Sequence, residues 1–350
     1  MKKYITCFAS LLFAFTAACN FEKFVPPEQP DDITNIPAVS DTTYLQLRPD
    51  WDSDAGYDFN APQDVLLGRE PLVYIADTGN DRIVMLDLAG NILGQSQPVP
   101  HPVAMTQDSK LRLLIVSNDN KIYRINLLAH GHDIANAPVE LVFEEVDNPD
   151  RRFTGISSQI LPFQGTARLT YLVTATGQQT RDNQVLIFPE EFDVRVANAV
   201  NLEPNGLGIL SASEPSGVTA LRDFSQDFIF CMVGQNNFKV QWLTAGEFGF
   251  VARLSPAQGN LAIFQPDKFS LPEDVTVDQI GNIYVVDAEA NYLYKFSPSG
   301  GELQSFGGSG SGERQFKNPQ GVAFFDKTLY VADTGNNRIV RFKLSTDIEQ

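Results

Sequence analysis

Short apolar runs separated by turn-forming residues make up most of the chain. Two segments repeat this pattern almost identically: Val73–Val84 reads VYIADTGNDRIV, and Leu329–Val340 reads LYVADTGNNRIV. In each, Thr-Gly-Asn separates two runs rich in β-branched and aromatic residues, a pattern more typical of buried strands than of helices. Gly and Asn tolerate the positive φ angles of tight strand connections. Each segment is therefore predicted to form a β-hairpin.

A second apolar element, which opens with proline, lies 14 or 15 residues before the aspartate of each hairpin. The same order of elements recurs in weaker form between the two strong copies. The units begin at Pro62, Pro102, Phe153, Pro215, Pro272 and Pro319, 40 to 62 residues apart. Repeated units of this length, each with three or four antiparallel strands, predict a β-propeller with six blades.

The last unit also carries a family resemblance. Phe316–Val322 followed by YVADTGNNRI at Tyr330–Ile339 closely resembles the NHL repeat. Units one and five share the resemblance, whereas units two to four share only the strand pattern. NHL-type chains form six-bladed rings around a central channel, so the resemblance implies an all-β, six-bladed propeller over residues 42–350.

The ends of this domain are predicted to pair. The last unit stops at Leu344, after its third strand, and leaves no room for a fourth. Near the start of the domain, Thr43–Arg48 alternates apolar and polar residues, as a half-buried strand does. We expect this segment to supply the missing outer strand and so to cover the edge of the final blade.

The N-terminus is typical of an export signal. Two lysines precede the apolar run Tyr4–Phe15, which is too short to span a bilayer but suits a signal peptide. The run ends in Ala-Ala-Cys19-Asn20, which resembles a bacterial lipobox. We therefore predict a lipoprotein signal peptide at 1–18, a lipid on Cys19 and a proline-rich flexible tether at 19–41. An ordinary cleaved signal peptide is the alternative.

Composition narrows the range of partners. The chain has 43 acidic and 26 basic side chains, a formal charge of −17. Nucleic acids and anionic lipid surfaces are polyanions and would be repelled. With three cysteines and three histidines, a disulfide scaffold and a multi-histidine metal centre are both disfavoured.

An acidic and a basic residue stand five positions apart in both strong hairpins, Asp77 with Arg82 and Asp333 with Arg338. Because the pair repeats, we interpret it as a brace for the hairpin turn. Features that differ between blades are better candidates for a site. Polar groups differ at the start of each innermost strand, which in such propellers faces the channel mouth. These ligand candidates are Gln63, Asp64, His101, Thr154, Ser216, Glu273, Asp274 and Gln320.

Polar groups that converge on one axis suit a small-ligand site, although they also simply hydrate a channel in many propellers. Six-bladed lactonases of the regucalcin and gluconolactonase type hold a divalent ion there. Pro204–Leu207 and Pro272–Val275 resemble fragments of that pattern. On this alternative the chain is a metal-dependent hydrolase or lactonase, with Ca²⁺ held by Asp64, Glu273 and Asp274.

No complete catalytic constellation is present in the sequence. We therefore expect a non-enzymatic, monomeric scaffold without a cofactor that binds a protein or glycan partner. It would lie in the bacterial cell envelope, held by its lipid alone, with Asn20 pointing to the outer membrane.

Overall fold

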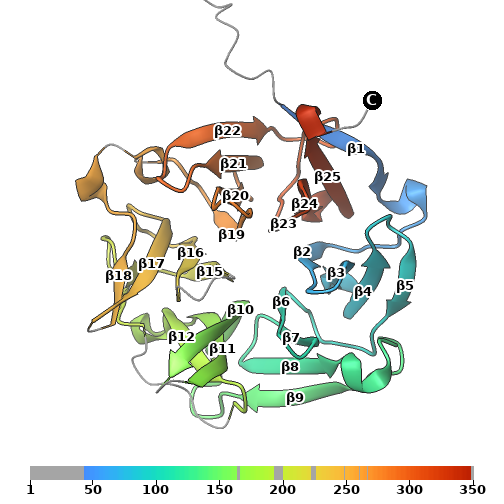
Figure 1. The fold of residues 1–350 in the computed structure, drawn as a ribbon, viewed down its shortest axis with the longest axis horizontal. Coiled ribbons are helices and arrows are strands. Elements are labelled where there is room, and N and C mark those ends of the chain that lie inside the picture. The colour runs from blue at the N-terminus through green and yellow to red at the C-terminus, as the bar shows by residue number, and fades with distance from the viewer. Residues whose placement is uncertain are drawn as a thin grey trace, which may run out of the picture. The chain divides into compact units, whose positions relative to one another are not determined.

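Six small antiparallel sheets stand around a common axis in the computed structural model (Figure 1). The model describes residues 43–163, 166–192, 200–221, 226–247, 249–259, 261–265 and 267–347. The predictions for the signal peptide, for Cys19 and for the tether to residue 41 lie outside these residues. Among the described residues, no helix has the length and apolar character needed to cross a bilayer.

The first three blades follow one another along the chain. Blade 1 contains β2 (Pro62–Leu67), β3 (Leu72–Asp77), β4 (Arg82–Asp87) and β5 (Ile92–Gln95). Blade 2 contains β6 (Ala104–Gln107), β7 (Arg112–Val116), β8 (Lys121–Asn126) and β9 (Val139–Glu144). Blade 3 contains β10 (Arg152–Phe163), β11 (Thr166–Thr176) and β12 (Gln184–Pro189).

The other three blades complete the ring. Blade 4 contains β15 (Pro215–Ala220), β16 (Phe228–Met232), β17 (Val240–Gly246) and β18 (Gly249–Ala252). Blade 5 contains β19 (Pro272–Val277), β20 (Ile283–Asp287), β21 (Tyr292–Phe296) and β22 (Glu302–Gly307). Blade 6 contains β23 (Gly321–Phe325), β24 (Thr328–Asp333), β25 (Arg338–Leu344) and β1 (Tyr44–Trp51).

Minor elements connect the blades. A short parallel pair, β13 (Glu203–Pro204) and β14 (Ser211–Ala212), precedes blade 4. Where the structure describes the chain, its helical segments are single 3₁₀ turns, namely η2 (Ser53–Ala55), η3 (Thr78–Asn80), η4 (Leu128–His130), η5 (Thr180–Asp182), η6 (Pro256–Gln258), η7 (Ala262–Phe264), η8 (Thr334–Asn336) and η9 (Ser345–Asp347).

Both faces of each blade pack against a neighbouring blade, which explains the continuous apolar runs. In β3, Val73 belongs to the core between blades 6 and 1, and the next residue, Tyr74, to the core between blades 1 and 2. Successive strand residues point to opposite faces of a sheet, so both faces must be apolar when both are buried. One such core lies at each of the six junctions between blades.

The predicted ring closure is confirmed. Strand β1 pairs antiparallel with β25, with Tyr44 opposite Leu344. Its two ends enter different cores: Tyr44 is fully buried between blades 5 and 6, and Trp51 is buried between blades 6 and 1. The closing strand therefore stabilises two junctions in addition to its own sheet.

Candidate functional site

A cavity of about 1140 Å³ runs along the axis and is lined by residues of all six innermost strands. These strands are β2, β6, β10, β15, β19 and β23, whose labels surround the centre of Figure 1. Residues near the starts of these strands contact the next blade at several junctions, namely Asp64 with Met105, Thr154 with Pro215 and Ser216 with Pro272. We call this end of the cavity the mouth. All the predicted ligand candidates except His101 line the cavity: Gln63, Asp64, Thr154, Ser216, Glu273, Asp274 and Gln320.

Two of these carboxylates join neighbouring blades. Asp64 Oδ2 accepts a hydrogen bond of 2.8 Å from the backbone N–H of Met105 in blade 2. Asp274 Oδ2 accepts one of 2.9 Å from Val322 N–H in blade 6, and its Oδ1 accepts from Val275 N–H. Each innermost strand pairs with only one other of the described strands, so its N–H groups on the channel side have no strand partner. The two carboxylates accept hydrogen bonds from such N–H groups.

The hydroxyl candidates also join blades. Thr154 Oγ1 donates a 2.7 Å hydrogen bond to the carbonyl of Pro215, and Ser216 Oγ donates one of 2.7 Å to the carbonyl of Pro272. Each acceptor is the proline that opens the next blade. At two further junctions the hydroxyl of a hairpin threonine makes the same bond, from Thr78 to Pro102 and from Thr334 to Pro62. These hydroxyls are therefore part of the scaffold.

Glycine replaces the aspartate in three other blades because the next blade lies too close for a side chain. A Cβ at Gly321 would be 2.6 Å from the carbonyl oxygen of Gln63 and 2.8 Å from Cα of Asp64. Gly155 and Gly217 face the following blade at similar distances. The position after the variable polar residue thus determines how tightly adjacent blades approach.

Three candidate side chains remain available at the mouth. Gln63, Glu273 and Gln320 line the cavity, and their side chains make no hydrogen bond to any described residue. They come from blades 1, 5 and 6, which are neighbours in the ring. The mouth therefore offers an arc of two amides and one carboxyl group on one side of the channel, which we call the mouth arc.

Burial changes the protonation of the mouth carboxyls. It raises the pKa of Asp64 to about 7 and the pKa of Glu273 to about 7, and the charge of Asp287 adds to the effect on Glu273. Burial also raises the pKa of Asp274 well above its usual value, with a further contribution from the charge of Asp64. Asp64 and Glu273 can therefore exchange protons near neutral pH.

His101 requires a correction. Its exposed ring lies outside the cavity lining, and Nδ1 is 2.7 Å from Asp81 Oδ1, which also accepts a hydrogen bond from the His101 backbone N–H. His101 precedes Pro102 and therefore lies before the inner strand, over the hairpin turn of blade 1. The first blade 2 residue that lines the cavity is Val103.

The donor set does not fit the calcium alternative. Among the described residues, no three His, Cys, Asp or Glu side chains are grouped so that they could hold a metal ion. Ca²⁺ takes six to eight oxygen ligands, whereas Asp64 and Asp274 already accept from backbone N–H groups. Asn205, in the fragment Pro204–Leu207, binds Asn183 outside the cavity lining.

The repeated ion pairs lie in the hairpin turns. Arg82 Nε is 2.7 Å from Asp77 Oδ2, and Arg338 Nε is 2.8 Å from Asp333 Oδ2. Both aspartates are fully buried, and each also accepts a backbone N–H at the start of its own blade, from Asn60 and Lys317. The pair thus connects the hairpin to the segment that leads into the inner strand.

The far end of the cavity was not predicted from the sequence. It is lined by Arg69, Gln107, Ser158, Trp242 and Arg253, among others. Gln107 and Ser158 lie late in the inner strands β6 and β10, Arg69 follows β2, and Trp242 and Arg253 belong to the outer part of blade 4. The proline register marks only the strand starts and so gives no signal for these residues.

Comparisons with known proteins agree with this architecture. Residues 316–342, which include β23 and β24, match the NHL repeat family. A search of curated protein sequences found no match. Similar solved structures include a protein of unknown function from Bacteroides thetaiotaomicron, with 13% identity and a TM-score of 0.59 over 86% of this chain and 73% of that one.

Two further similar structures carry functional names. Regucalcin from Agrobacterium tumefaciens, described as a calcium-binding protein, has 11% identity and a TM-score of 0.54 over 81% of this chain and 90% of its own. A gluconolactonase from Xanthomonas campestris has 11% identity and a TM-score of 0.53 over 87% and 98%. At such identities the likeness concerns the fold. The chain is a six-bladed β-propeller that carries an NHL repeat at residues 316–342.

Proposed function

We propose that this propeller is a non-enzymatic binding protein whose ligand is a glycan held at the mouth of the central cavity. The observation that carries the proposal is the mouth arc. Gln63, Gln320 and Glu273 line the cavity from three adjacent blades, and their side chains are not used by the scaffold. The other polar groups of the mouth hold the blades together and keep this arc in place.

The chemistry of the arc favours a glycan. Amide and carboxyl groups both donate to and accept from neighbouring hydroxyls, and a few such groups in a concave site fix the orientation of a ligand. A protein partner would be expected to use a continuous apolar patch. The exposed large apolar side chains in the described part of the chain are instead spread over separate outer strands, with the pair Ile92 and Leu93 on β5 and single residues such as Leu141, Val251 and Leu303 elsewhere.

The metal-dependent hydrolase remains the second candidate. The similar structures named regucalcin and gluconolactonase favour it, as does the raised pKa of Glu273, because a carboxyl that titrates near neutral pH suits acid–base chemistry. The hydrogen-bonded state of Asp64 and Asp274 weighs against it. Glycan binding therefore accounts for more of the site.

The location is proposed on the sequence alone. A lipid on Cys19 and a tether to residue 41 would hold the domain in the bacterial cell envelope. Asn20, the residue after the proposed lipidated cysteine, favours the outer membrane.

A glycan array tests the function. The wild type should bind a defined subset of oligosaccharides, and Gln63→Ala, Gln320→Ala and Glu273→Ala should each weaken that binding about tenfold or more, the loss of one to two buried hydrogen bonds. His101→Ala, outside the cavity, is the matched control and should bind as the wild type does. The hydrolase would be established instead if no glycan binds and the protein hydrolyses gluconolactone in a Ca²⁺-dependent reaction that Glu273→Gln abolishes.

A further inference from the structure

The two ends of the cavity differ in charge. Among the described lining residues, the cationic side chains are Arg69 and Arg253. Arg69 comes two residues after the last residue of β2. Arg253 contacts Asp227, which directly precedes β16 and thus lies where β15 ends. Both arginines therefore lie at the end opposite the mouth, which we call the far end.

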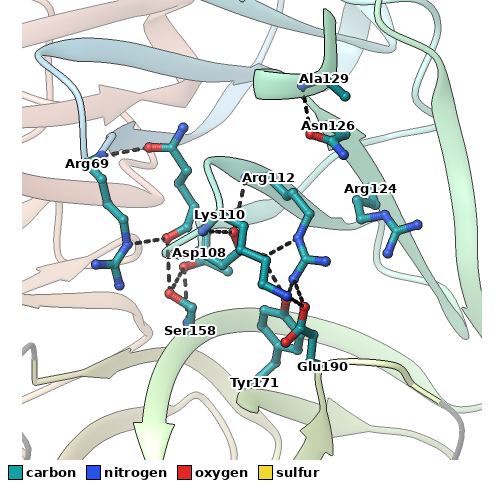
Figure 2. A network of polar contacts seen from close by, with 12 residues as sticks. Arg69, Asp108, Lys110, Arg112, Arg124, Asn126, Ala129, Ser158, Tyr171 and Glu190 are labelled. Atoms are coloured by element: carbon teal, nitrogen blue, oxygen red, sulfur yellow. Dashed lines mark hydrogen bonds and ion pairs between the residues drawn. The ribbon is translucent and has the colours of Figure 1, made fainter. Parts of the chain in front are cut away.

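Arg69 is held in one orientation by Gln107 of blade 2. Its backbone N–H donates to Gln107 Oε1 at 2.6 Å, and its Nε donates to the Gln107 carbonyl oxygen at 3.3 Å (Figure 2). Although Arg69 is exposed, these bonds hold its backbone and its Nε, so part of the loss of side-chain rotamer freedom is incurred before any ligand binds.

Gln107 is itself anchored. It is only 4% exposed, and its carbonyl oxygen also accepts a 3.0 Å hydrogen bond from Ser158 Oγ of blade 3. Three blades thus support the Arg69 guanidinium. Its two terminal nitrogens, which Figure 2 shows directed away from the network, have no hydrogen bond or ion pair with any described residue.

Most other charged groups at the far end already have partners; Asp326, which follows β23, is an acidic lining residue with no hydrogen bond or ion pair from its carboxylate to a described residue. The Arg253 guanidinium stacks over the Trp242 ring at 4.8 Å, and its Nε is 3.6 Å from Asp227 Oδ2. Asp278 accepts hydrogen bonds on both oxygens, including one of 3.1 Å from the Tyr284 hydroxyl. Arg69 is therefore the lining cation that is oriented but not neutralised.

We propose that Arg69 is an anion-binding residue at the far end, which holds a carboxylate of a ligand that extends through the cavity from the mouth arc, and this makes the ligand an acidic, uronate-type glycan. The sugar part of this inference rests on the proposed function, whereas the carboxylate site does not. Two parallel N–H groups on the terminal nitrogens match the two oxygens of a carboxylate, the strongest and most directional of the common charge-assisted pairs. In a chain of charge −17, such an oriented cation also provides selectivity, because anions without this geometry are repelled.

Side-chain NMR of the arginine Nε–H resonances, with D-glucuronate, D-glucose and inorganic phosphate as probes, tests the proposal. Glucuronate should shift the Arg69 signal saturably and bind at least about tenfold more tightly than glucose, which lacks the carboxylate. Arg69→Gln should remove this preference, and Arg69→Lys, which keeps the charge but not the paired N–H groups, should restore only part of it. Arg124→Gln removes the same charge from a residue that binds Glu140 on β9, and should leave the preference intact.

Each outcome decides one claim. Equal binding of glucuronate and glucose, or a preference unchanged in Arg69→Gln, would overturn the Arg69 site even if the mouth binds sugars. Tighter binding of phosphate than of glucuronate would overturn the carboxylate assignment. If glucuronate shifts Arg69 while no oligosaccharide depends on the mouth arc, the proposed function fails and the anion site stands.

Discussion

Arg338 and Asp50 form a buried ion pair of 2.8 Å although they are separated by 288 positions in the chain. Arg338 also binds Asp333 of its own hairpin, so one guanidinium joins the last hairpin to the closing strand. In blade 1 the equivalent Arg82 instead reaches Gln95 of its own outer strand. The same repeat residue thus serves ring closure only where the two chain ends meet.

Replacement of Asp50 should therefore destabilise the whole ring. Asp50→Ala leaves part of the Arg338 charge uncompensated in a buried site, and we expect a loss of about 3 kcal/mol in the free energy of unfolding. Urea denaturation followed by fluorescence measures it. Asp54→Ala, an exposed neighbour in η2, is the control and should change the free energy by less than about 0.5 kcal/mol. Equal effects of the two variants would contradict the role of the pair.

The Asp64 carboxyl should make stability depend on pH. Its pKa is about 7 in the folded chain and near 3.8 when unfolded, so the folded state binds the proton more tightly. Stability from this group is present below pH 4, falls as the pH rises towards 7, and is then constant. Asp64→Asn keeps an acceptor for Met105 N–H without the charge. It should gain stability over the wild type as the pH rises from 4 to 8, by on the order of 2–4 kcal/mol at most.

Denaturation midpoints of the two proteins at pH 4, 6 and 8 check this expectation. The difference between the variant and the wild type reports the Asp64 charge together with its effect on the pKa of Asp274, and cancels the contribution of the other carboxyls. If the difference in denaturation midpoint between the two proteins does not grow with pH, the Asp64 carboxyl does not cause the pH dependence of stability.

Close approach of the inner strands predicts a strong effect of one methyl group. Gly321→Ala would place a Cβ within 2.6 Å of the Gln63 carbonyl oxygen, a backbone atom that cannot move alone. We expect a loss of about 2 kcal/mol or more, as for overpacked cores. Gly208→Ala, where a Cβ meets nothing within 4 Å, is the matched control, and thermal unfolding compares the two. Similar melting temperatures of the two variants would show that the contact between Gly321 and the Gln63 backbone is not rigid.

The lipid prediction has a direct test. Mass spectrometry of the wild-type protein purified from membranes should detect acyl chains on Cys19, and Cys19→Ala should appear in the soluble envelope fraction without them. Acylation that persists in Cys19→Ala would refute the predicted site.

Repetition made the scaffold predictable from the sequence. Tyr74 and Tyr330 lie in runs whose apolar character is continuous because both sheet faces are buried, and the turn residues between runs set the strand boundaries. The alternation in Thr43–Arg48 was enough to predict the closing strand. Blade 3 was predicted less well, because the polar residues Ser157, Ser158 and Gln159 conceal the middle of the long strand β10.

The site was predictable in position but not in role. The proline register located Gln63 and Glu273 on the cavity wall, yet it could not distinguish them from Asp64. The acceptor role of Asp64 depends on the N–H of a residue 41 positions away, and only the assembled ring brings that group near. Arg69 gave no signal because its orientation depends on Gln107 in another blade.

Pairing of β1 with β25 also sets the order in which the protein can be completed. Among the described residues, the first strand in the sequence pairs with the last, so Tyr44 and Trp51 must stay without their final cores until the rest of the blades exist. Contacts so distant in sequence slow folding, and the unpaired edge of β25 stays open to other chains during that delay. The newly made chain therefore passes through an open ring before β1 and β25 pair. The yield of folded protein should depend on how well this open form is protected from aggregation.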